Sequence, residues 1–244
     1  MPMDAPQAKP ILFVRCEPDE TFGVGPAAVE AAGGSVLEWN ALDAESPKPR
    51  LEDVAGVVVF GSSFNVEHAD EQPFIKEVRE LTREAVDTGV PYLGVCFGAQ
   101  MLAWSLDAEI TKAPVREIGF EPIRPLASAA DDRLLAHYEP GDHVFQWHMD
   151  TFALPDGAEL LVTGDGVHHQ AYRVGDRTWG VQFHFEIDRA EIETWLTAFE
   201  ATEDLAVTWG KPSDAVRAEA DRYLAVHQDK GRRVFERFAE LVAP

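Results

Sequence analysis

Short apolar runs alternate with longer amphipathic stretches through the first hundred residues of the chain. Residues 54–60 are continuously apolar, which is typical of a strand buried on both faces of a parallel sheet. Similar runs predict further strands, and the stretches between them predict helices that end at glycines. The predicted strands span residues 11–15, 35–39, 54–60 and 91–95, and the predicted helices span residues 25–32 and about 72–88. Strands separated by helices of this length predict an open, mostly parallel sheet.

The pattern changes after Asp107. Short strand-like segments follow, separated by turn residues such as Gly175 and Asp176, and they predict antiparallel hairpins added to the sheet. These segments span residues 118–123, 143–148, 159–163, 170–173 and 178–185, with a short helical turn expected at residues 131–136. The whole pattern predicts an α/β protein with an open, flavodoxin-like sheet that has helices on both faces.

Helical periodicity returns near the end of the chain. Residues 188–200 predict one amphipathic helix, and residues 214–241 predict one or two more, with a break near Lys230-Gly231. No internal repeat or long linker divides the sequence. We therefore interpret residues 1–244 as one domain, with residues 205–244 as a helical extension packed on it.

Charge and composition narrow the possible partners. The 244 residues include 43 acidic and 21 basic side chains, a net charge of −22 that disfavours nucleic acid and anionic membrane surfaces. No apolar run reaches membrane-spanning length, and the start of the chain does not resemble a signal peptide, so we expect a cytoplasmic protein. The phosphate-binding pattern GxxxxGK[ST] does not occur, and we expect no cofactor.

The histidine and cysteine pattern does not favour a metal site. Cys16 and Cys96 do not form a CxxC pair, so neither a disulfide framework nor a zinc site is expected. His168 and His169 are adjacent, and neighbouring side chains on a strand point in opposite directions. We interpret Cys16 as a packed or spare thiol.

Cys96 lies where a predicted strand meets the helix that we expect to open near Gln100. The local sequence is Tyr-Leu-Gly-Val-Cys-Phe-Gly-Ala-Gln, and a strand, turn and helix would place the thiol beside the positive end of the helix dipole. This position favours the nucleophilic thiolate. A lone cysteine is more often a packing residue than a nucleophile, so a partner is required.

A partner is present at His184 and Glu186. These residues are two apart, so on an extended chain both side chains point to the same side. An imidazole held by a carboxylate is the base that a thiol nucleophile needs. Only the fold can bring this pair to Cys96.

These ordered motifs resemble those of the class I glutamine amidotransferases. Gly-Val-Cys96-Phe-Gly-Ala-Gln is similar to the nucleophile turn of that family, and Gln-Phe-His184-Phe-Glu186 is similar to its second motif. Residues 146–152 and 170–173 resemble the stand-alone branch that is similar to the amidotransferase domain of GMP synthase. The resemblance covers about residues 57–186. It implies that Cys96 attacks the side-chain amide of glutamine to form a γ-glutamyl thioester, that His184 carries protons, and that Glu186 orients the imidazole.

The resemblance also implies an oxyanion hole. Its backbone donors would be the N–H of Phe97 and an N–H of the Gly61-Ser62 turn. The family usually has two adjacent glycines in this turn, and Ser62 stands at the second. A serine keeps the backbone donor but not the conformational freedom of glycine.

The resemblance also implies contacts with the substrate. Gln100 resembles the family glutamine that helps to hold the amino-acid head group. His148 and Asp150 are further candidates, although a histidine and an aspartate at a strand end are often structural. Met149 lies between them, where the related branch often has glycine.

Three functions remain open. The first is hydrolysis of free glutamine, with the ammonia passed to a separate synthetase subunit. The second is a solitary γ-glutamyl peptidase or hydrolase, and the third is a binding or regulatory protein that keeps the fold without turnover. Each implies a small-molecule ligand, and none implies a metal, a nucleic acid or a membrane.

Overall fold

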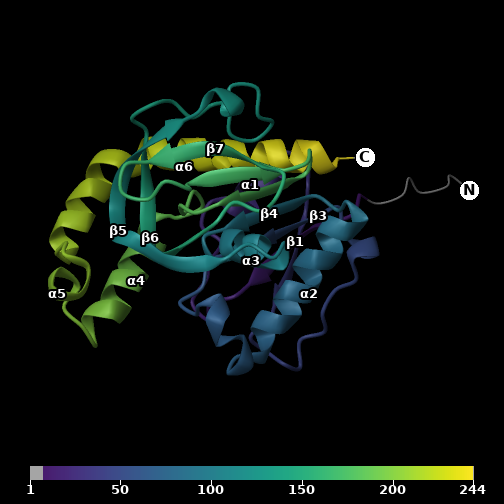
Figure 1. The fold of residues 1–244 in the computed structure, drawn as a ribbon, viewed down its shortest axis with the longest axis horizontal. Helices are drawn as coiled ribbons and strands as arrows, with labels where there is room; N and C mark the ends of the chain where they lie inside the picture. Colours follow the sequence, from purple (N-terminus) through teal and green to yellow (C-terminus); the bar gives the residue numbers. More distant parts are fainter. Residues whose placement is uncertain (1–7, 244) are drawn as a thin grey trace, which may run out of the picture.

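The computed structural model describes residues 8–243, and a nine-stranded sheet runs through this part of the chain (Figure 1). The strand order is β2-β1-β3-β4-β9-β8-β7-β5-β6. Neighbours from β2 to β9 pair in parallel, and those from β9 to β6 pair antiparallel. The bounds are β1 Ile11–Arg15, β2 Val36–Asn40, β3 Gly56–Val59, β4 Tyr92–Val95, β5 Ile110–Pro125, β6 His143–Phe152, β7 Ala158–Gly164, β8 Ala171–Val174 and β9 Thr178–Val181. The predicted α/β sheet with added antiparallel strands is confirmed.

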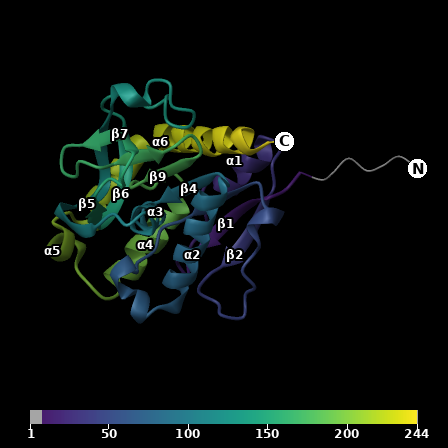
Figure 2. The ribbon, with the colours of Figure 1, turned by 45° about the vertical axis from the view of Figure 1, so that its right-hand side comes forward.

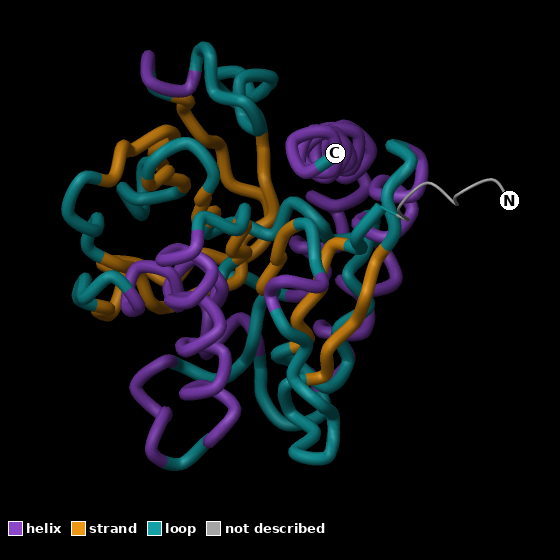
Figure 3. Tube along the Cα trace, turned by 90° about the vertical axis from the view of Figure 1, so that its right-hand side faces the viewer, coloured by secondary structure: helices purple, strands orange, loops and turns teal. Residues whose placement is uncertain are grey.

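Helices cover both faces of the parallel part of this sheet. Helices α1 and α6 pack together on one face, and α2 and α3 pack together on the other (Figures 1 and 2). Figure 3 shows α6 from its C-terminal end. The α-helices are α1 Gly25–Ala31, α2 Pro73–Thr88, α3 Phe97–Ser105, α4 Arg189–Glu200, α5 Leu205–Trp209 and α6 Ser213–Val242, and the short 3-10 helices are η1 Leu51–Asp53, η2 Val66–Asp70 and η3 Ala127–Ala129.

Strands β3 and β4 are buried at every position because both of their faces are covered, whereas the edge strand β2 contains the exposed Glu38. In β3, Val58 packs in the cluster beneath α1 and α6, whereas Val57 and Val59 pack in the cluster beneath α2 and α3. Successive side chains of a strand point to opposite faces, so each layer needs its own apolar positions. The apolar run at residues 54–60, which predicted this strand, is continuous because both faces of the strand are buried.

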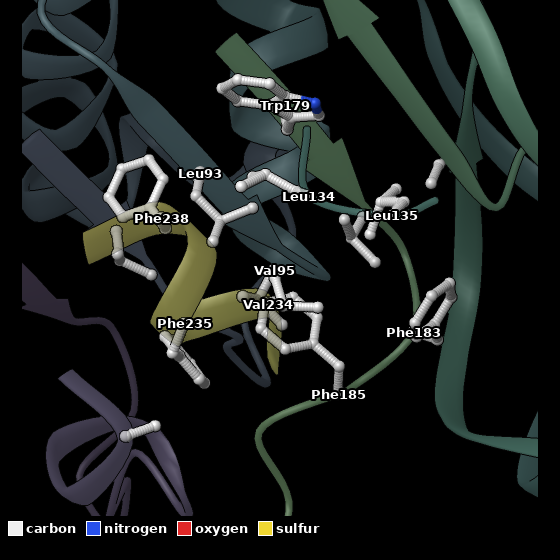
Figure 4. Packing of buried hydrophobic residues seen from close by; sticks show 14 of the residues in the cluster. Leu93, Val95, Leu134, Leu135, Trp179, Phe183, Phe185, Val234, Phe235 and Phe238 are labelled. Atoms are coloured by element: carbon white, nitrogen blue, oxygen red, sulfur yellow. The ribbon is translucent and has the colours of Figure 1, made fainter. Parts of the chain in front are cut away.

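Helix α6 contributes large side chains to the first of these clusters. Phe235 and Phe238 of α6 are fully buried beside Leu93 and Val95 of β4, the strand that leads to Cys96 (Figure 4). Burying a phenylalanine side chain contributes about 1.5–3 kcal/mol to stability. The last long helix is therefore part of the support beneath the thiol.

A third cluster joins the antiparallel strands to the C-terminal helices. Phe120 of β5 and Phe145 of β6 pack against buried residues of α4, α5 and α6. Their rings meet edge to face, with centroids 5.4 Å apart. This packing holds α4 against the antiparallel strands β5 and β6.

The predicted break in the last helix is wrong. Residues 213–242 form one continuous helix, and Gly231 lies within it. A Cβ added to Gly231 would lie 1.9 Å from the carbonyl oxygen of Phe185. The glycine is there because the helix passes directly against another backbone, not because the helix ends.

Smaller differences concern element bounds. Helix α3 begins at Phe97, three residues before the predicted start, and β9 ends at Val181, before the predicted end at residue 185. Strand β5 is longer than residues 118–123 because its first half pairs with β6 through main-chain bonds while most of its side chains stay exposed. The helical turn predicted at residues 131–136 is a run of turns that follows η3.

Candidate active site

Cys96 occupies the sharp corner between β4 and α3. Its φ of 49° and ψ of −105° are rare for a residue with a side chain. A Cβ on Gly94 would lie 2.3 Å from the Gly98 carbonyl oxygen, and one on Gly98 would lie 2.1 Å from that of Val59. Both glycines are therefore needed for the strand, turn and helix to pack this closely. The corner holds the thiol at the N-terminus of α3, where the helix dipole favours negative charge.

His184 and Glu186 lie on the segment after β9, the neighbour of β4 in the sheet. The Nδ1 atom of His184 lies 2.6 Å from Oε1 of Glu186, and both side chains are buried. The other ring nitrogen, Nε2, is left for a second partner, and His184 lines the same cleft as Cys96. The fold thus brings together the thiol, the imidazole and the carboxylate.

The electrostatics of this pair favour a charged imidazole. Burial alone would lower the pKa of His184, but the Glu186 carboxylate and the charge of Cys96 raise that pKa well above its usual value. An imidazolium beside a cysteine stabilises the thiolate form. Cys16 behaves differently, because burial, followed by Glu20 and Glu17, raises the pKa of its thiol.

The backbone of His184 is fixed from two sides. Its N–H donates to the carbonyl of Phe145 at 2.9 Å, and its carbonyl accepts from Nε2 of His227 at 2.8 Å. Burial lowers the pKa of His227 to about 4, so this ring is neutral near pH 7 and donates through Nε2–H. Sequence reasoning missed His227, because its only signal was a histidine on the buried face of a predicted helix.

The Gly61-Ser62 turn follows β3 and faces the imidazole. A Cβ on Gly61 would lie 2.7 Å from Cε1 of His184, so this position has room only for glycine. Ser62 differs, because within residues 8–243 the non-glycine residues with positive φ are Phe22, Cys96 and Asp107. The serine therefore adopts its conformation without the strain expected from the family pattern.

The Ser62 hydroxyl also secures the turn. Its Oγ donates to the carbonyl oxygen of Cys16 at 2.7 Å and accepts from the N–H of Phe64 at 3.2 Å. The next N–H, that of Ser63, donates to Oε2 of Glu17 at 2.7 Å. These bonds tie the turn to the residues that follow β1. The backbone preference of a glycine at position 62 would not provide such bonds.

Gln100, His148 and Asp150 meet on the other side of the thiol. Nε2 of Gln100 donates to the carbonyl of Asp150 at 3.3 Å and to Oε1 of Gln182 at 3.2 Å, while Nε2 of Gln182 donates to Sγ of Cys96 at 3.6 Å. Nζ of Lys112 lies 2.8 Å from Oδ1 of Asp150. The fold therefore brings all three predicted substrate contacts to the thiol.

Behind His148 lies a buried polar network that the sequence did not reveal. Glu117 Oε2 lies 3.0 Å from Nε2 of His148 and accepts from Nε2 of Gln170 at 2.8 Å, while Oε1 accepts from the N–H of Val167 at 3.1 Å. Gln146 donates to Gln170 at 2.8 Å. Buried polar groups are stable when they are hydrogen-bonded in this way. The only available signal in the sequence was that Gln146 and Gln170 open the two segments, residues 146–152 and 170–173, that resemble the family.

The cleft has two lobes that meet at Cys96. The larger lobe, about 320 Å³, is lined by His184 and aromatic side chains. The smaller lobe, about 90 Å³, is lined by Gln100, His148 and Asp150. Ser62 and Ser63 line both lobes. The thiol can thus face a ligand that extends in two directions.

Other polar groups lie outside this cleft. His168 Nδ1 lies 2.7 Å from Oγ1 of Thr163, and His169 Nδ1 lies 2.6 Å from the carbonyl oxygen of Phe152. Within residues 8–243, no three His, Cys, Asp or Glu side chains are grouped so that they could hold a metal ion. In the same part of the chain, no helix has both the length and the apolar character to span a bilayer.

Residues 29–199 match the family model described as glutamine amidotransferase class-I. The chain therefore belongs to the class I glutamine amidotransferase family. A solved structure of a glutamine amidotransferase from Thermotoga maritima has a TM-score of 0.84 and 25% identity, covering 95% of this chain and 98% of that one. A glutamine amidotransferase from Methylobacillus flagellatus, 24% identical, has the same fold, with a TM-score of 0.83 over 96% of this chain and 95% of that one.

Two curated relatives match this chain over very different shares of their own length. The glutamine-hydrolysing GMP synthase of Porphyromonas gingivalis is 34% identical over 60% of this chain, but the match spans only 28% of that protein. The glutamine amidotransferase-like protein YfeJ of Salmonella typhimurium is 28% identical over 73% of this chain and 75% of its own length. The likeness to the GMP synthase concerns only about a quarter of that protein.

Proposed function

We propose that this protein hydrolyses a γ-glutamyl amide bond through a γ-glutamyl thioester on Cys96. The observation that carries the proposal is the placement of His184, held by Glu186 at 2.6 Å, in the same cleft as a cysteine on a strained strand-to-helix corner. Such a strained corner is typical of nucleophiles in α/β hydrolytic enzymes. Family membership supports amide chemistry of glutamine in general.

Acylation would begin with attack of the Cys96 thiolate on the γ-carbonyl carbon. Backbone N–H groups of Phe97 and of the Gly61-Ser62 turn would stabilise the oxyanion, and one such donor contributes about 10²–10³ in rate in a serine protease. The imidazolium of His184 would then protonate the leaving nitrogen, and the C–N bond would break. Glu186 would keep the ring in position throughout.

Deacylation would reverse these roles. His184, now neutral, would take a proton from water, and the resulting hydroxide would attack the thioester carbon. The C–S bond would break, and glutamate would leave while the imidazolium and thiolate pair is restored. Gln100 and Asp150 are placed to hold the amino-acid head group in the smaller lobe.

Two enzymatic versions differ in the leaving group. With free glutamine the product would be ammonia, and a separate synthetase subunit could receive it, as the GMP synthase relatives suggest. With a substituted amide the product would be an amine, and no synthetase would be needed. A protein that only binds such ligands would not turn over either substrate.

The test is turnover together with a trapped intermediate. The purified protein is incubated with glutamine and with γ-glutamyl amides while glutamate, ammonia and amine release are measured. Intact-mass spectrometry of the quenched reaction should show a γ-glutamyl adduct on wild-type protein and none on Cys96→Ala. Cys16→Ala is the matched control and should retain turnover. Glutamate release that survives Cys96→Ala would disprove the mechanism.

A further inference from the structure

The two lobes of the cleft are not equivalent. The smaller lobe contains Gln100 and Asp150, whose amide and carboxylate suit the charged head group of a γ-glutamyl compound. The larger lobe contains His184. If the proposed function holds, His184 must reach the leaving nitrogen, because it is the acid that protonates it. The leaving group therefore lies in the larger lobe.

The larger lobe is too large for ammonia alone. Its volume is about 320 Å³, whereas a water molecule, which is similar in size to ammonia, occupies about 30 Å³ in the liquid. A substituted amine of several heavy atoms would fill much more of this space. The size of the lobe points to an N-substituted γ-glutamyl amide.

The walls of the larger lobe are aromatic. Trp147, Trp195 and Phe199 line it, and the rings of Trp147 and Trp195 meet edge to face with centroids 5.9 Å apart. The Trp195 ring also lies against His184, at 5.0 Å between centroids. Aromatic faces attract cations, most strongly those of tryptophan. They also cover the methylene groups of an alkyl amine.

The rim of the same lobe is acidic. Glu17 and Asp19 line it, and among residues 8–243 no lysine or arginine does. Within residues 8–243, neither carboxylate forms a salt bridge with a basic side chain of the chain itself. One oxygen of Glu17 accepts the N–H of Ser63, and this bond holds the carboxylate beside the cleft. A positive group in the lobe would neutralise these charges, and a negative group would be repelled.

From this combination we infer that the substrate class is a γ-glutamyl amide of an amine that carries a second, positively charged nitrogen. The inference rests on the proposed function and specifies its leaving group. The amide nitrogen would lie next to His184, the alkyl chain along the tryptophans, and the distal ammonium at Glu17 and Asp19. The Sγ–C bond would form first, and the γ-C–N bond would then break as the His184 proton passes to the released amine. Water would then give glutamate and restore the thiolate.

The experiment compares four γ-glutamyl compounds of different leaving groups. The cationic probe is the monoamide of 1,5-diaminopentane, and its neutral match is the hexylamide, in which a methyl group replaces the ammonium. γ-Glutamylglycine supplies an anionic leaving group, and free glutamine supplies ammonia. We expect kcat/KM for the cationic amide to exceed that for the hexylamide by about tenfold or more, with γ-glutamylglycine the poorest of the three substituted amides.

Variants test whether the rim carries this preference. Glu17→Gln retains an oxygen for the Ser63 N–H, and Asp19→Asn retains the size of the side chain. The double variant should bring the ratio of cationic to neutral amide close to one. Asp156→Asn is the matched control, because Asp156 is exposed and lines neither lobe, and it should keep the wild-type ratio. Each ratio is measured within one variant, so partial loss of folded protein cancels.

The outcomes separate this inference from the proposed function. Equal kcat/KM for the cationic and neutral amides in the wild-type protein, or glutamine as the best substrate, would overturn the substrate class and leave thioester chemistry intact. A cationic preference that survives the double variant would overturn the role of Glu17 and Asp19. If none of the four compounds acylates Cys96, both the substrate class and the proposed function are wrong.

Discussion

Nε2 of His227 donates a hydrogen bond to the backbone carbonyl of His184, across 2.8 Å and 43 residues of sequence. His227 is buried, on the face of α6 that packs against the sheet. The segment after β9 that carries His184 has no regular strand pairing of its own at this point, since β9 ends at Val181. The C-terminal helix therefore holds one side of the backbone that carries the imidazole, and Phe145 of β6 holds the other.

Removing this donor should impair catalysis more than substrate binding. His227→Ala leaves the His184 carbonyl without its partner and opens a cavity, so we expect kcat to fall about tenfold and stability to fall by about 1–3 kcal/mol. KM should change little, because His227 lines neither lobe of the cleft. His227→Gln, whose amide can reach the same carbonyl, should restore much of kcat. A kcat that stays at the wild-type value in His227→Ala would show that this hydrogen bond does not position His184.

The same histidine predicts acid sensitivity. Burial lowers the pKa of His227 to about 4, and that of His137 also to about 4, below the unfolded value near 6.5. A depressed pKa means that the unfolded chain binds more protons, so this stability is present above pH 6.5 and is lost as the pH falls toward 4. The Tm should therefore drop over this range, and less steeply in His227→Gln. An equally steep drop in that variant would contradict the assignment.

Gly231 gives a second test of the contact between α6 and the segment that carries His184. Gly231→Ala would place a Cβ 1.9 Å from the carbonyl oxygen of Phe185, so the helix or the segment must move. In an open helix position alanine is the better residue, but here overpacking should cost about 1–3 kcal/mol. Chemical denaturation and kcat should both report the change. Val226→Ala, on the exposed face of the same helix, is the control and should alter neither appreciably.

The parts of the fold that could be predicted from sequence are those set by local burial. Strand β3 is apolar at every position because both of its faces are covered, as Val57 and Val58 show. The Cys96 corner could also be predicted, because Gly94 and Gly98 mark a close approach of strand and helix. Each of these signals lies within a few residues of the feature that it indicates.

The parts that could not be predicted depend on contacts between distant segments. Gly231 resembles a helix break in sequence, and only the carbonyl of Phe185 shows why a glycine is needed inside a helix. Glu117 is one acidic residue in a polar stretch until the fold brings Gln170 within 2.8 Å of it. From sequence, Ser62 looks like a poor substitute for glycine. The hydrogen bond that makes it suitable joins it to Cys16, 46 residues away, and cannot be seen in the local sequence.

This bond reverses the expected effect of a family-like substitution at Ser62. Ser62→Gly removes the Oγ bonds to Cys16 and Phe64 without relieving any positive φ. We expect a loss of about 1 kcal/mol in stability and a lower kcat, because the Gly61-Ser62 turn, which we propose binds the oxyanion, becomes more mobile. Ser62→Ala separates the loss of the hydroxyl bonds from the gain in backbone freedom. Alanine lacks the hydroxyl, but its Cβ restricts the backbone as that of serine does. A kcat that rises in Ser62→Gly would show that the family glycine suits this turn better.

Glu186 should control the alkaline limit of activity. Its carboxylate, together with the charge of Cys96, holds the pKa of His184 well above its usual value despite burial. Glu186→Gln removes the negative charge that stabilises the imidazolium, so the pKa of His184 must fall and the alkaline limb of kcat/KM must move to lower pH. We also expect kcat to fall by about 10²–10⁴, as loss of the orienting carboxylate does in a serine protease. An alkaline limb that does not move would assign that limb to another group.

A second carboxylate behind this pair should limit stability at high pH. Burial first, and then the nearby charges of Glu191 and Glu186, raise the pKa of Glu20 well above its usual value. A raised pKa means that the folded protein binds the proton more tightly than the unfolded chain does. The stability linked to Glu20 is therefore present at low pH and is lost as the pH rises through the pKa of Glu20 in the folded protein.

The variant Glu20→Gln tests this linkage. Its side chain stays neutral and keeps an oxygen for the N–H of Phe22, which Oε1 of Glu20 accepts at 2.7 Å. We expect this variant to be more stable than the wild type at pH 8, by about 1 kcal/mol or more, and closer to it at pH 5. Urea denaturation at both pH values measures the difference, and Glu45→Gln on the exposed loop after β2 controls for the loss of one negative charge. A Glu20→Gln variant that is less stable than the wild type at pH 8 would show that this carboxylate contributes to stability in its charged form.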